Sequence, residues 1–309
     1  MDKVIIGIHG LANKPEAEVL ERWWMESILE GLNHIRSSHT AINFELVYWA
    51  GYLYKNSMHR EEGYEFDDLY NSEPYIMAET GALIEHDDDW KDGMRKFVGQ
   101  ILGTSADRLR RTFNVDGVTN FVLSRKLKDL DYYYDERKQV KNKDGNLEET
   151  KTVLQAELES TLEKHAGKDI MLIAHSMGSI IAYDVLRNMG KTGSGVRVDE
   201  FVTIGSPLGV PYVKSKVVEE RLKRNFADAE EVRTPTIISR SWTNFADPLD
   251  PVSLDQHLRD DYGSNDGGIK VRDDIVENDY VGEDGERNHH KSYGYLRTPE
   301  LSKLIDRFL

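Results

Sequence analysis

The chain contains no cysteine in any of its 309 positions. Disulfide bonds, thiolate metal sites and a cysteine nucleophile are therefore excluded. Any covalent chemistry must use another nucleophile, and any metal ion would depend on nitrogen and oxygen ligands alone.

Basic residues are also scarce, because 40 Lys and Arg stand against 55 Asp and Glu, for a formal net charge of −15. Proteins that bind nucleic acid release counterions with clustered Lys and Arg. We therefore expect no nucleic-acid partner. The one basic neighbourhood comprises Arg108, Arg110, Arg111, Arg125, Lys126 and Lys128. It either steers an anionic or amphiphilic substrate or belongs to an ordinary solvated pair of amphipathic helices.

Long apolar runs are missing as well. No run approaches the roughly 18–20 apolar residues of a membrane-spanning helix. The apolar run at 4–8 (VIIGI) is only five residues long, which is shorter than the apolar core of a signal peptide. We expect no transmembrane segment and a cytoplasmic location.

Short β-branched runs instead alternate with segments of helical periodicity. The expected strands lie at 4–8, 42–49, 169–174, 201–205 and 236–242. Helices are expected between them, and a last one opens at Thr298-Pro299, where Thr298 can cap it. This order predicts an α/β fold with a doubly wound, mostly parallel sheet, and ligands at the carboxyl ends of its strands.

The stretch from about 52 to 150 differs in character. It contains a triple-aspartate run at 87–89 and amphipathic segments at 94–102 and 119–130, but no buried parallel strand. So long a structureless loop would be unusual in a compact domain. We therefore predict a large, mainly helical cap insertion in a single domain of residues 1–309, whose core comprises 1–51 and 151–309.

The sequence IAHSMGS at 173–179 lies between an expected strand and an expected helix. That context is typical of a nucleophile elbow, a tight turn that exposes a serine hydroxyl above the sheet at the N-terminus of the next helix. Ser176 is the candidate nucleophile. The alternative is an ordinary connection in which Ser176 only caps the helix.

The first expected strand ends in His9-Gly10-Leu11, where hydrolases of this architecture build half of the oxyanion hole. The backbone N–H groups of Leu11 and Met177 are the candidate oxyanion donors. Alternatively, His9 is a buried core histidine and Gly10 simply a turn residue.

A serine nucleophile needs an imidazole base that is oriented by a carboxylate. After the last expected strand of the sheet, Asp247 and Asp250 are the candidate carboxylates; before the terminal helix, His289 and His290 are the candidate bases. This chain order, Ser, Asp and His, is the one that a nucleophile elbow predicts. A neutral imidazole is required, so activity should fall below about pH 6–7.

Metal binding is the competing interpretation of these residues. Two adjacent histidines without a third ligand at a suitable spacing form an incomplete zinc site. The acidic loops at 260–268 and 283–286 lack the ligand spacing of an EF-hand. We expect solvated loops there rather than structural calcium, and neither a metal nor a cofactor.

Together these motifs resemble the α/β-hydrolase superfamily, in its serine esterase and lipase branch. The resemblance rests on 4–11, 170–183, 201–209, 237–252 and 289–293. It implies Ser176 as nucleophile and Leu11 and Met177 as oxyanion donors. It favours Asp250, which Pro-Val follows, over Asp247, and His290, in a His-x-x-Tyr context, over His289.

The sequence departs from that superfamily in three ways. Ala174 stands where the elbow usually has glycine. The first strand begins so early that the leading antiparallel strands are expected to be missing. The insertion precedes the nucleophile strand, whereas the usual lid follows the next one.

The resemblance implies a serine hydrolase that cleaves carboxylic ester or thioester bonds of a small-molecule or lipid-like acyl substrate through an acyl-enzyme. One alternative is an amidase or peptidase on the same scaffold. Another is a binding module that has lost catalysis, although both aspartates and both histidines are present. The sequence sets no expectation for the oligomeric state.

Overall fold

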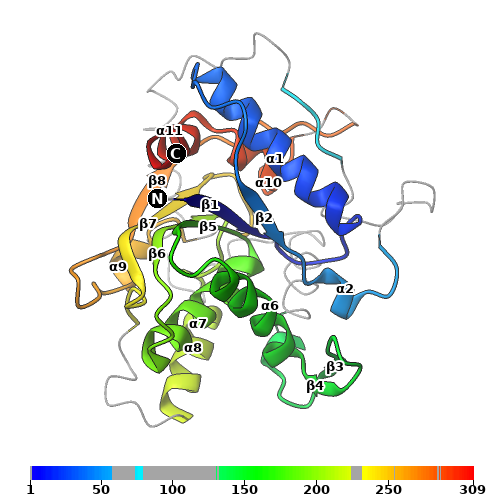
Figure 1. The fold of residues 1–309 in the computed structure, drawn as a ribbon, viewed down its shortest axis with the longest axis vertical. Helices are drawn as coiled ribbons and strands as arrows, with labels where there is room; N and C mark the ends of the chain where they lie inside the picture. Colours follow the sequence, from blue (N-terminus) through cyan, green and yellow to red (C-terminus); the bar gives the residue numbers. More distant parts are fainter. Residues whose placement is uncertain are drawn as a thin grey trace, which may run out of the picture.

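The computed structural model describes residues 2–57, 74–78, 130, 132–223, 232–253, 255–283, 285 and 287–309. Its centre is a six-stranded sheet in the order β2-β1-β5-β6-β7-β8 (Figure 1). The strands are β2 (Phe44–Val47), β1 (Lys3–Ile8), β5 (Asp169–His175), β6 (Val198–Ile204), β7 (Ile238–Ala246) and β8 (Arg272–Ile275). Every neighbouring pair is parallel. The α/β fold predicted from the sequence is confirmed.

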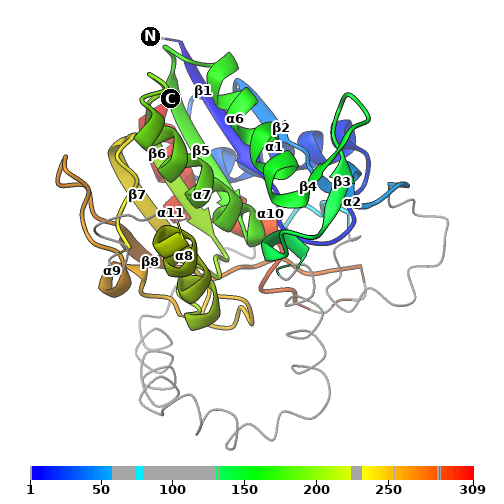
Figure 2. The same ribbon diagram turned by 90° about the horizontal axis from the view of Figure 1, so that it is seen from below.

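Helices cover both faces of the sheet (Figures 1 and 2). One face carries α1 (Ala17–His34), α10 (Ser292–Leu296) and α11 (Pro299–Phe308); the other carries α6 (Thr150–Lys164), α7 (Met177–Thr192) and α8 (Pro211–Lys223). Two short helices, α2 (Ala50–Leu53) and α9 (Leu258–Asp261), lie in connecting segments. A parallel sheet covered in this way needs strands that are apolar on both sides.

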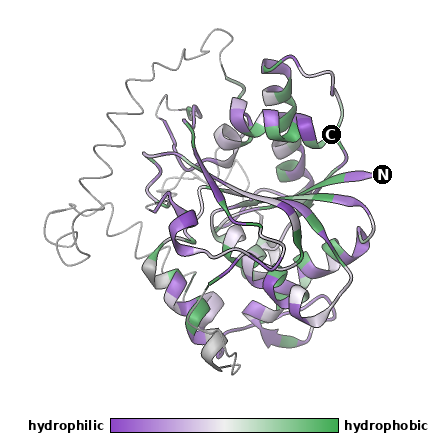
Figure 3. Cartoon of the chain, turned by 90° about the vertical axis from the view of Figure 1, so that its left-hand side faces the viewer, coloured by the Kyte–Doolittle hydropathy of each residue, from purple (hydrophilic) through white to green (hydrophobic). Residues whose placement is uncertain are grey.

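The central strands are apolar on both sides because successive side chains of a strand point to opposite faces of the sheet, and in these strands the side chains toward both faces are apolar. In β5, Ile170 and Leu172 pack with α6 and α7, while Met171 and Ile173 pack with α1 and α11. Two separate apolar cores result, one on each side of the sheet. Figure 3 shows hydrophobic and hydrophilic segments alternating along the helices that supply the rest of these cores.

The helix boundaries follow the expected signals where those signals are strong. Thr298 caps α11, because its side chain accepts a hydrogen bond from the Leu301 N–H at 3.4 Å. The apolar stripe of α1 buries Leu20, Trp24 and Ile28 against the sheet. None of the helices in the described part of the chain combines the length and the apolarity needed to cross a membrane.

One part of the sequence prediction needs correction. The edge strand β8 was not predicted, because its sequence RDDI offers no apolar run. Within the predicted helical cap, β3 (Gln139–Lys141) and β4 (Leu147–Glu149) form an antiparallel hairpin, whose turn contains Asn142 and Gly145. The rest of the predicted cap, including its basic neighbourhood, lies mostly outside the described residues.

A buried guanidinium joins three segments that are far apart in the sequence. Arg297, which follows α10, donates to Asp279 at 2.7 Å, to Glu30 of α1 at 3.2 Å and to the carbonyl of Ile76 at 2.7 Å. Glu30 also accepts from the Tyr75 hydroxyl at 2.7 Å. The side chains of Arg297 and Glu30 are each 3% exposed. Breaking a buried ion pair leaves an uncompensated charge, which makes this cluster important for stability.

We expect Arg297→Met to lower the free energy of unfolding by about 3 kcal/mol, because Glu30 would keep a buried negative charge without its ion-pair partner. Urea denaturation measures the change. Arg22→Met is the matched control, since Arg22 pairs with Glu26 on the surface, with the two side chains 57% and 43% exposed. It should cost about 0.5 kcal/mol or less. Equal losses in the two variants would contradict this interpretation.

Candidate active site

The carboxyl ends of three parallel strands bring most of the predicted site residues to one edge of the sheet. β5 ends at His175, immediately before Ser176, and β1 ends at Ile8, immediately before His9. The segment that follows β7 contains Asp247 and Asp250. Ligands of open α/β sheets bind at this edge.

Ser176 lies in a strained turn between β5 and α7. Its backbone has φ 54° and ψ −129°, and its side chain is buried. A non-glycine residue with positive φ costs free energy that the surrounding structure has to offset. The Ser176 N–H donates to the carbonyl of Ile204 in β6 at 3.1 Å, and its own carbonyl accepts from the Ser179 N–H at 2.9 Å. These bonds hold the hydroxyl at the N-terminus of α7.

The segment after β1 approaches this turn very closely. A Cβ added to Gly10 would lie 2.6 Å from the Ser176 Cβ and 3.2 Å from its Oγ. Only a glycine allows the backbone that leads into Leu11 to come this near the hydroxyl. Among the described residues, neither the Leu11 N–H nor the Met177 N–H donates a hydrogen bond. Because Leu11 follows Gly10 and Met177 follows Ser176, the two candidate oxyanion donors belong to the segments that meet at this turn.

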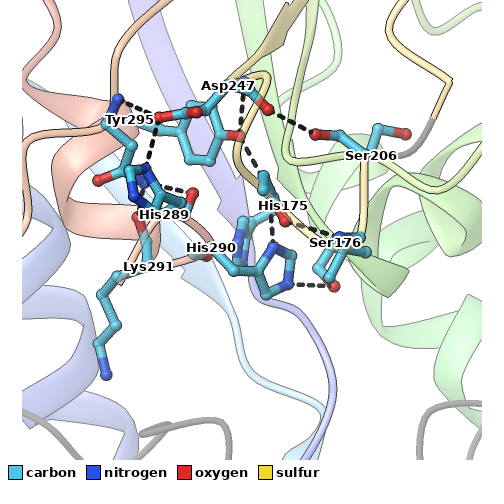
Figure 4. Close-up of polar contacts among 12 residues, drawn as sticks. His175, Ser176, Ser206, Asp247, His289, His290, Lys291 and Tyr295 are labelled. Atoms are coloured by element: carbon cyan, nitrogen blue, oxygen red, sulfur yellow. Dashed lines mark hydrogen bonds and ion pairs between the residues drawn. The ribbon is translucent and has the colours of Figure 1, made fainter. Parts of the chain in front are cut away.

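His290 connects Ser176 to Asp250. Its Nε2 lies 3.0 Å from the Ser176 Oγ (Figure 4), and its Nδ1 lies 2.9 Å from the Asp250 Oδ2. The Asp250 side chain is fully buried and its Oδ1 accepts from the Val252 N–H at 2.8 Å. Since the carboxylate accepts the Nδ1 proton, the Nε2 is the ring atom that faces the hydroxyl as an acceptor.

The alternates form a second, separate pair. His289 Nδ1 lies 3.1 Å from the Asp247 Oδ2, and Asp247 also accepts from the N–H groups of Leu249 at 2.7 Å and Asn278 at 2.6 Å. Figure 4 shows His289 beside Asp247, with His290 between it and Ser176. The structure therefore joins Ser176, His290 and Asp250 by hydrogen bonds and places the alternates, Asp247 and His289, outside that set of contacts.

Two side chains hold the loop that carries both histidines. The Asn278 amide donates to the carbonyl of His289 at 3.0 Å and to that of Lys291 at 2.8 Å. His175 Nε2 lies 2.8 Å from the carbonyl of His290, and the two imidazoles lie 4.7 Å apart at their centroids. His175 thus fixes the backbone of the candidate base from the strand that precedes the nucleophile.

Some of these features could not be found by sequence reasoning. Asn278 lies outside every motif that was considered. Gly205 lies in the segment that looked lipase-like, and its role is spatial: it has φ 53°, and a Cβ there would lie 2.8 Å from the Asp250 Oδ2. The aromatic residue of the His-x-x-Tyr pattern, Tyr293, packs against the rings of Trp23, Tyr75 and Tyr280.

His9 has the structural role that the sequence left as an alternative. Its Nε2 accepts from the Trp49 N–H at 3.1 Å, so its Nδ1 donates to the carbonyl of Gly10 at 2.8 Å. Burial, followed by the charge of Lys14, lowers the pKa of His9 from 6.5 to about 3. This imidazole is therefore neutral at physiological pH and supports the turn that leads to Leu11.

A small pocket adjoins the candidate base. It is lined by His9, Lys14, Leu20, Trp24, His175, Asn288, His290, Lys291, Ser292 and Tyr293. Polar residues next to the two histidines, Asn288, Lys291 and Ser292, form one part of its wall, and Leu20 and Trp24 of α1 form an apolar part. A substrate group bound there would lie beside the His290 imidazole.

Comparison with known protein families agrees with the fold. The sequence profile of the lecithin:cholesterol acyltransferase family matches residues 130–217, a range that contains α6, β5, Ser176, α7 and β6. No curated protein sequence gives a significant match. With its parallel sheet and the turn at Ser176, the chain resembles the α/β-hydrolase superfamily, in its lipase-like branch. Over residues 130–217 it is similar to the lecithin:cholesterol acyltransferase family in particular.

The lowered pKa of His9 predicts a defined pH dependence of stability. Between pH 6.5 and about 3, the unfolded chain binds a proton at His9 that the folded chain does not, so stability falls as the pH falls. The slope from one such proton is about 1.4 kcal/mol per pH unit. His9→Gln keeps a donor and an acceptor but cannot titrate.

Urea denaturation at pH 4, 5 and 6 tests this expectation. The His9→Gln slope should be smaller than the wild-type slope by close to one proton, whereas His257→Gln, at an exposed position, should leave it unchanged. Parallel slopes for the wild type and His9→Gln would refute the assignment.

Proposed function

We propose that the chain is a serine hydrolase that cleaves carboxylic ester or thioester bonds of a lipid-like acyl substrate through an acyl-enzyme on Ser176. The single observation that carries the proposal is the hydrogen-bonded chain from Asp250 through His290 to the Ser176 hydroxyl, with spacings of 2.9 and 3.0 Å. Those separations allow an imidazole to take the serine proton while the carboxylate holds the tautomer. The match to an acyltransferase family over residues 130–217 supports the same chemistry.

In the acylation step, His290 Nε2 removes the proton of Ser176 as the Oγ attacks the carbonyl carbon. A carbon–oxygen bond forms, and the carbonyl oxygen becomes an oxyanion that the Leu11 and Met177 N–H groups can bind. Donors fixed before the reaction stabilise the developing charge without reorganising. The imidazolium then protonates the leaving alcohol or thiol as its bond to the acyl carbon breaks.

The acyl group leaves Ser176 by the acylation steps in reverse order. His290 takes a proton from an incoming water or alcohol, whose oxygen attacks the ester formed with Ser176, and then returns a proton to the serine. Water as acceptor gives hydrolysis, and an alcohol gives acyl transfer, the reaction in the name of the lecithin:cholesterol acyltransferase family. The pocket beside His290 lies where either acceptor could approach the imidazole.

An amidase or a peptidase would use the same three residues. Comparing kcat/KM for an ester and an amide with the same acyl group separates these reactions. We expect the ester to be the far better substrate.

Replacing the nucleophile gives the first test. Ser176→Ala should lower kcat for a p-nitrophenyl acyl ester by about 10⁴-fold or more. It should also abolish covalent labelling by a fluorophosphonate probe, because it removes the hydroxyl that lies 3.0 Å from His290 Nε2. Ser194→Ala, at an exposed loop position, is the matched control and should be labelled like the wild type. Labelling of Ser176→Ala at the wild-type rate would refute the assignment of the nucleophile.

The adjacent histidines give the second test. His290→Gln should lower kcat by about 10³-fold or more, because a glutamine cannot take the serine proton. His289→Gln is the matched control, since its ring contacts Asp247 rather than Ser176, and kcat should stay within about threefold of the wild-type value. The opposite order of losses would assign the base to His289 and the carboxylate to Asp247.

A further inference from the structure

Tyr295 of α10 is buried directly behind the candidate carboxylate. Its hydroxyl lies 2.8 Å from the Asp250 Oδ2, the oxygen that also accepts from His290. No part of the Tyr295 side chain is exposed. Residues two apart on a helix face different directions, which is why Tyr295 reaches the carboxylate while Tyr293 turns to a neighbouring cluster of aromatic rings.

The direction of this hydrogen bond is fixed by a second contact. The backbone N–H of Asp247 lies 2.9 Å from the Tyr295 oxygen. A peptide N–H can only donate, so the tyrosine oxygen accepts there and its own hydrogen points to Asp250. Burial and the two nearby aspartates raise the pKa of Tyr295 well above its ordinary value, so that the hydroxyl remains a donor throughout the range in which the enzyme works.

Space for this arrangement comes from Gly205 at the end of β6. A Cβ there would lie 2.8 Å from the Asp250 Oδ2, 3.2 Å from the His290 Nδ1 and 3.2 Å from the Tyr295 ring. The three groups therefore pack against one backbone position that cannot carry a side chain. Asp250 has little freedom to rotate away from the imidazole while Tyr295 is present.

We propose that Tyr295 is a positioning residue that acts through Asp250: its hydroxyl fixes the carboxylate toward His290 Nδ1 and shares the carboxylate charge with the imidazole. The inference rests on the proposed function. Loss of the hydroxyl concentrates negative charge on the side of Asp250 that faces His290. A more negative partner favours the imidazolium, and a loosened carboxylate orients the imidazole less well.

Tyr295→Phe tests the proposal with little change in volume. We expect kcat for a p-nitrophenyl ester to fall about tenfold with KM within twofold, and the acidic limb of the kcat/KM profile to move upward by at least half a pH unit. Ser176 and the His175 ring, which also face His290, are unchanged in this variant. Tyr262→Phe is the matched control, because Tyr262 is equally buried and donates to the Leu208 carbonyl at 3.0 Å. This variant should be less stable than the wild type, with the acidic limb of its kcat/KM profile at the wild-type pH.

A double-mutant cycle separates action through Asp250 from a general loss of packing. In the wild-type background, Tyr295→Phe should lower the fluorophosphonate labelling rate about tenfold, whereas in an Asp250→Asn background it should change that rate less than twofold. A full tenfold loss in that background, or an unmoved acidic limb in the single variant, would overturn the proposal.

A readout without turnover keeps this proposal distinct from the proposed function. The downfield proton resonance of His290 Nδ1, identified by its absence in His290→Gln, should move in Tyr295→Phe and stay in place in Tyr262→Phe. If the wild-type protein does not cleave esters but the His290 Nδ1 resonance moves in Tyr295→Phe, only the ester chemistry is refuted. If the wild-type protein cleaves esters but the resonance does not move in Tyr295→Phe, only the role of Tyr295 is refuted.

Discussion

The left-handed backbone of Ser176 is the constraint on which the site depends. A serine in this conformation points its hydroxyl away from the strand that precedes it and toward the loops at the carboxyl edge of the sheet. The turn is unfavourable by itself, and its neighbours hold it: β6 accepts the serine N–H, and Gly10 lets the end of β1 lie against the serine side chain. The position of the Ser176 hydroxyl therefore depends on the parallel sheet as well as on the local motif.

The remaining groups are arranged around that fixed hydroxyl by loops with little regular structure of their own. Asn278 and His175 hold the carbonyl groups of the histidine loop, so the imidazole is oriented through its backbone. Asp250 is held by the Val252 N–H and by Tyr295. Such a network is favourable only when each buried polar atom has a partner, which explains why so many side chains surround three reacting groups.

The sequence was most informative where a residue type has one strong physical reason to occur. The strand runs of β1 and β5 are apolar on both sides, and the serine turn needs small neighbours, so the architecture and the position of Ser176 could be predicted. The edge strand β8 could not, because half of an edge strand faces solvent and its sequence is polar. Within the site, the spacing to Tyr293 favoured His290 over His289, but no sequence pattern indicated that Tyr295 of α10 contacts the carboxylate. Side-chain direction is a property of three-dimensional packing that spacing alone does not give.

The two apolar cores have a consequence for how this protein would respond to heat. Ser176 immediately precedes α7, which packs in the core of one sheet face, while Tyr295 and α10 pack in the core of the other face. Ser176 and Tyr295 are thus attached to opposite layers, and a slight loosening of either layer changes the distance between them. Thermal inactivation should then begin below the temperature at which the secondary structure melts, so that the catalytic rate is a more sensitive gauge of interlayer packing than circular dichroism.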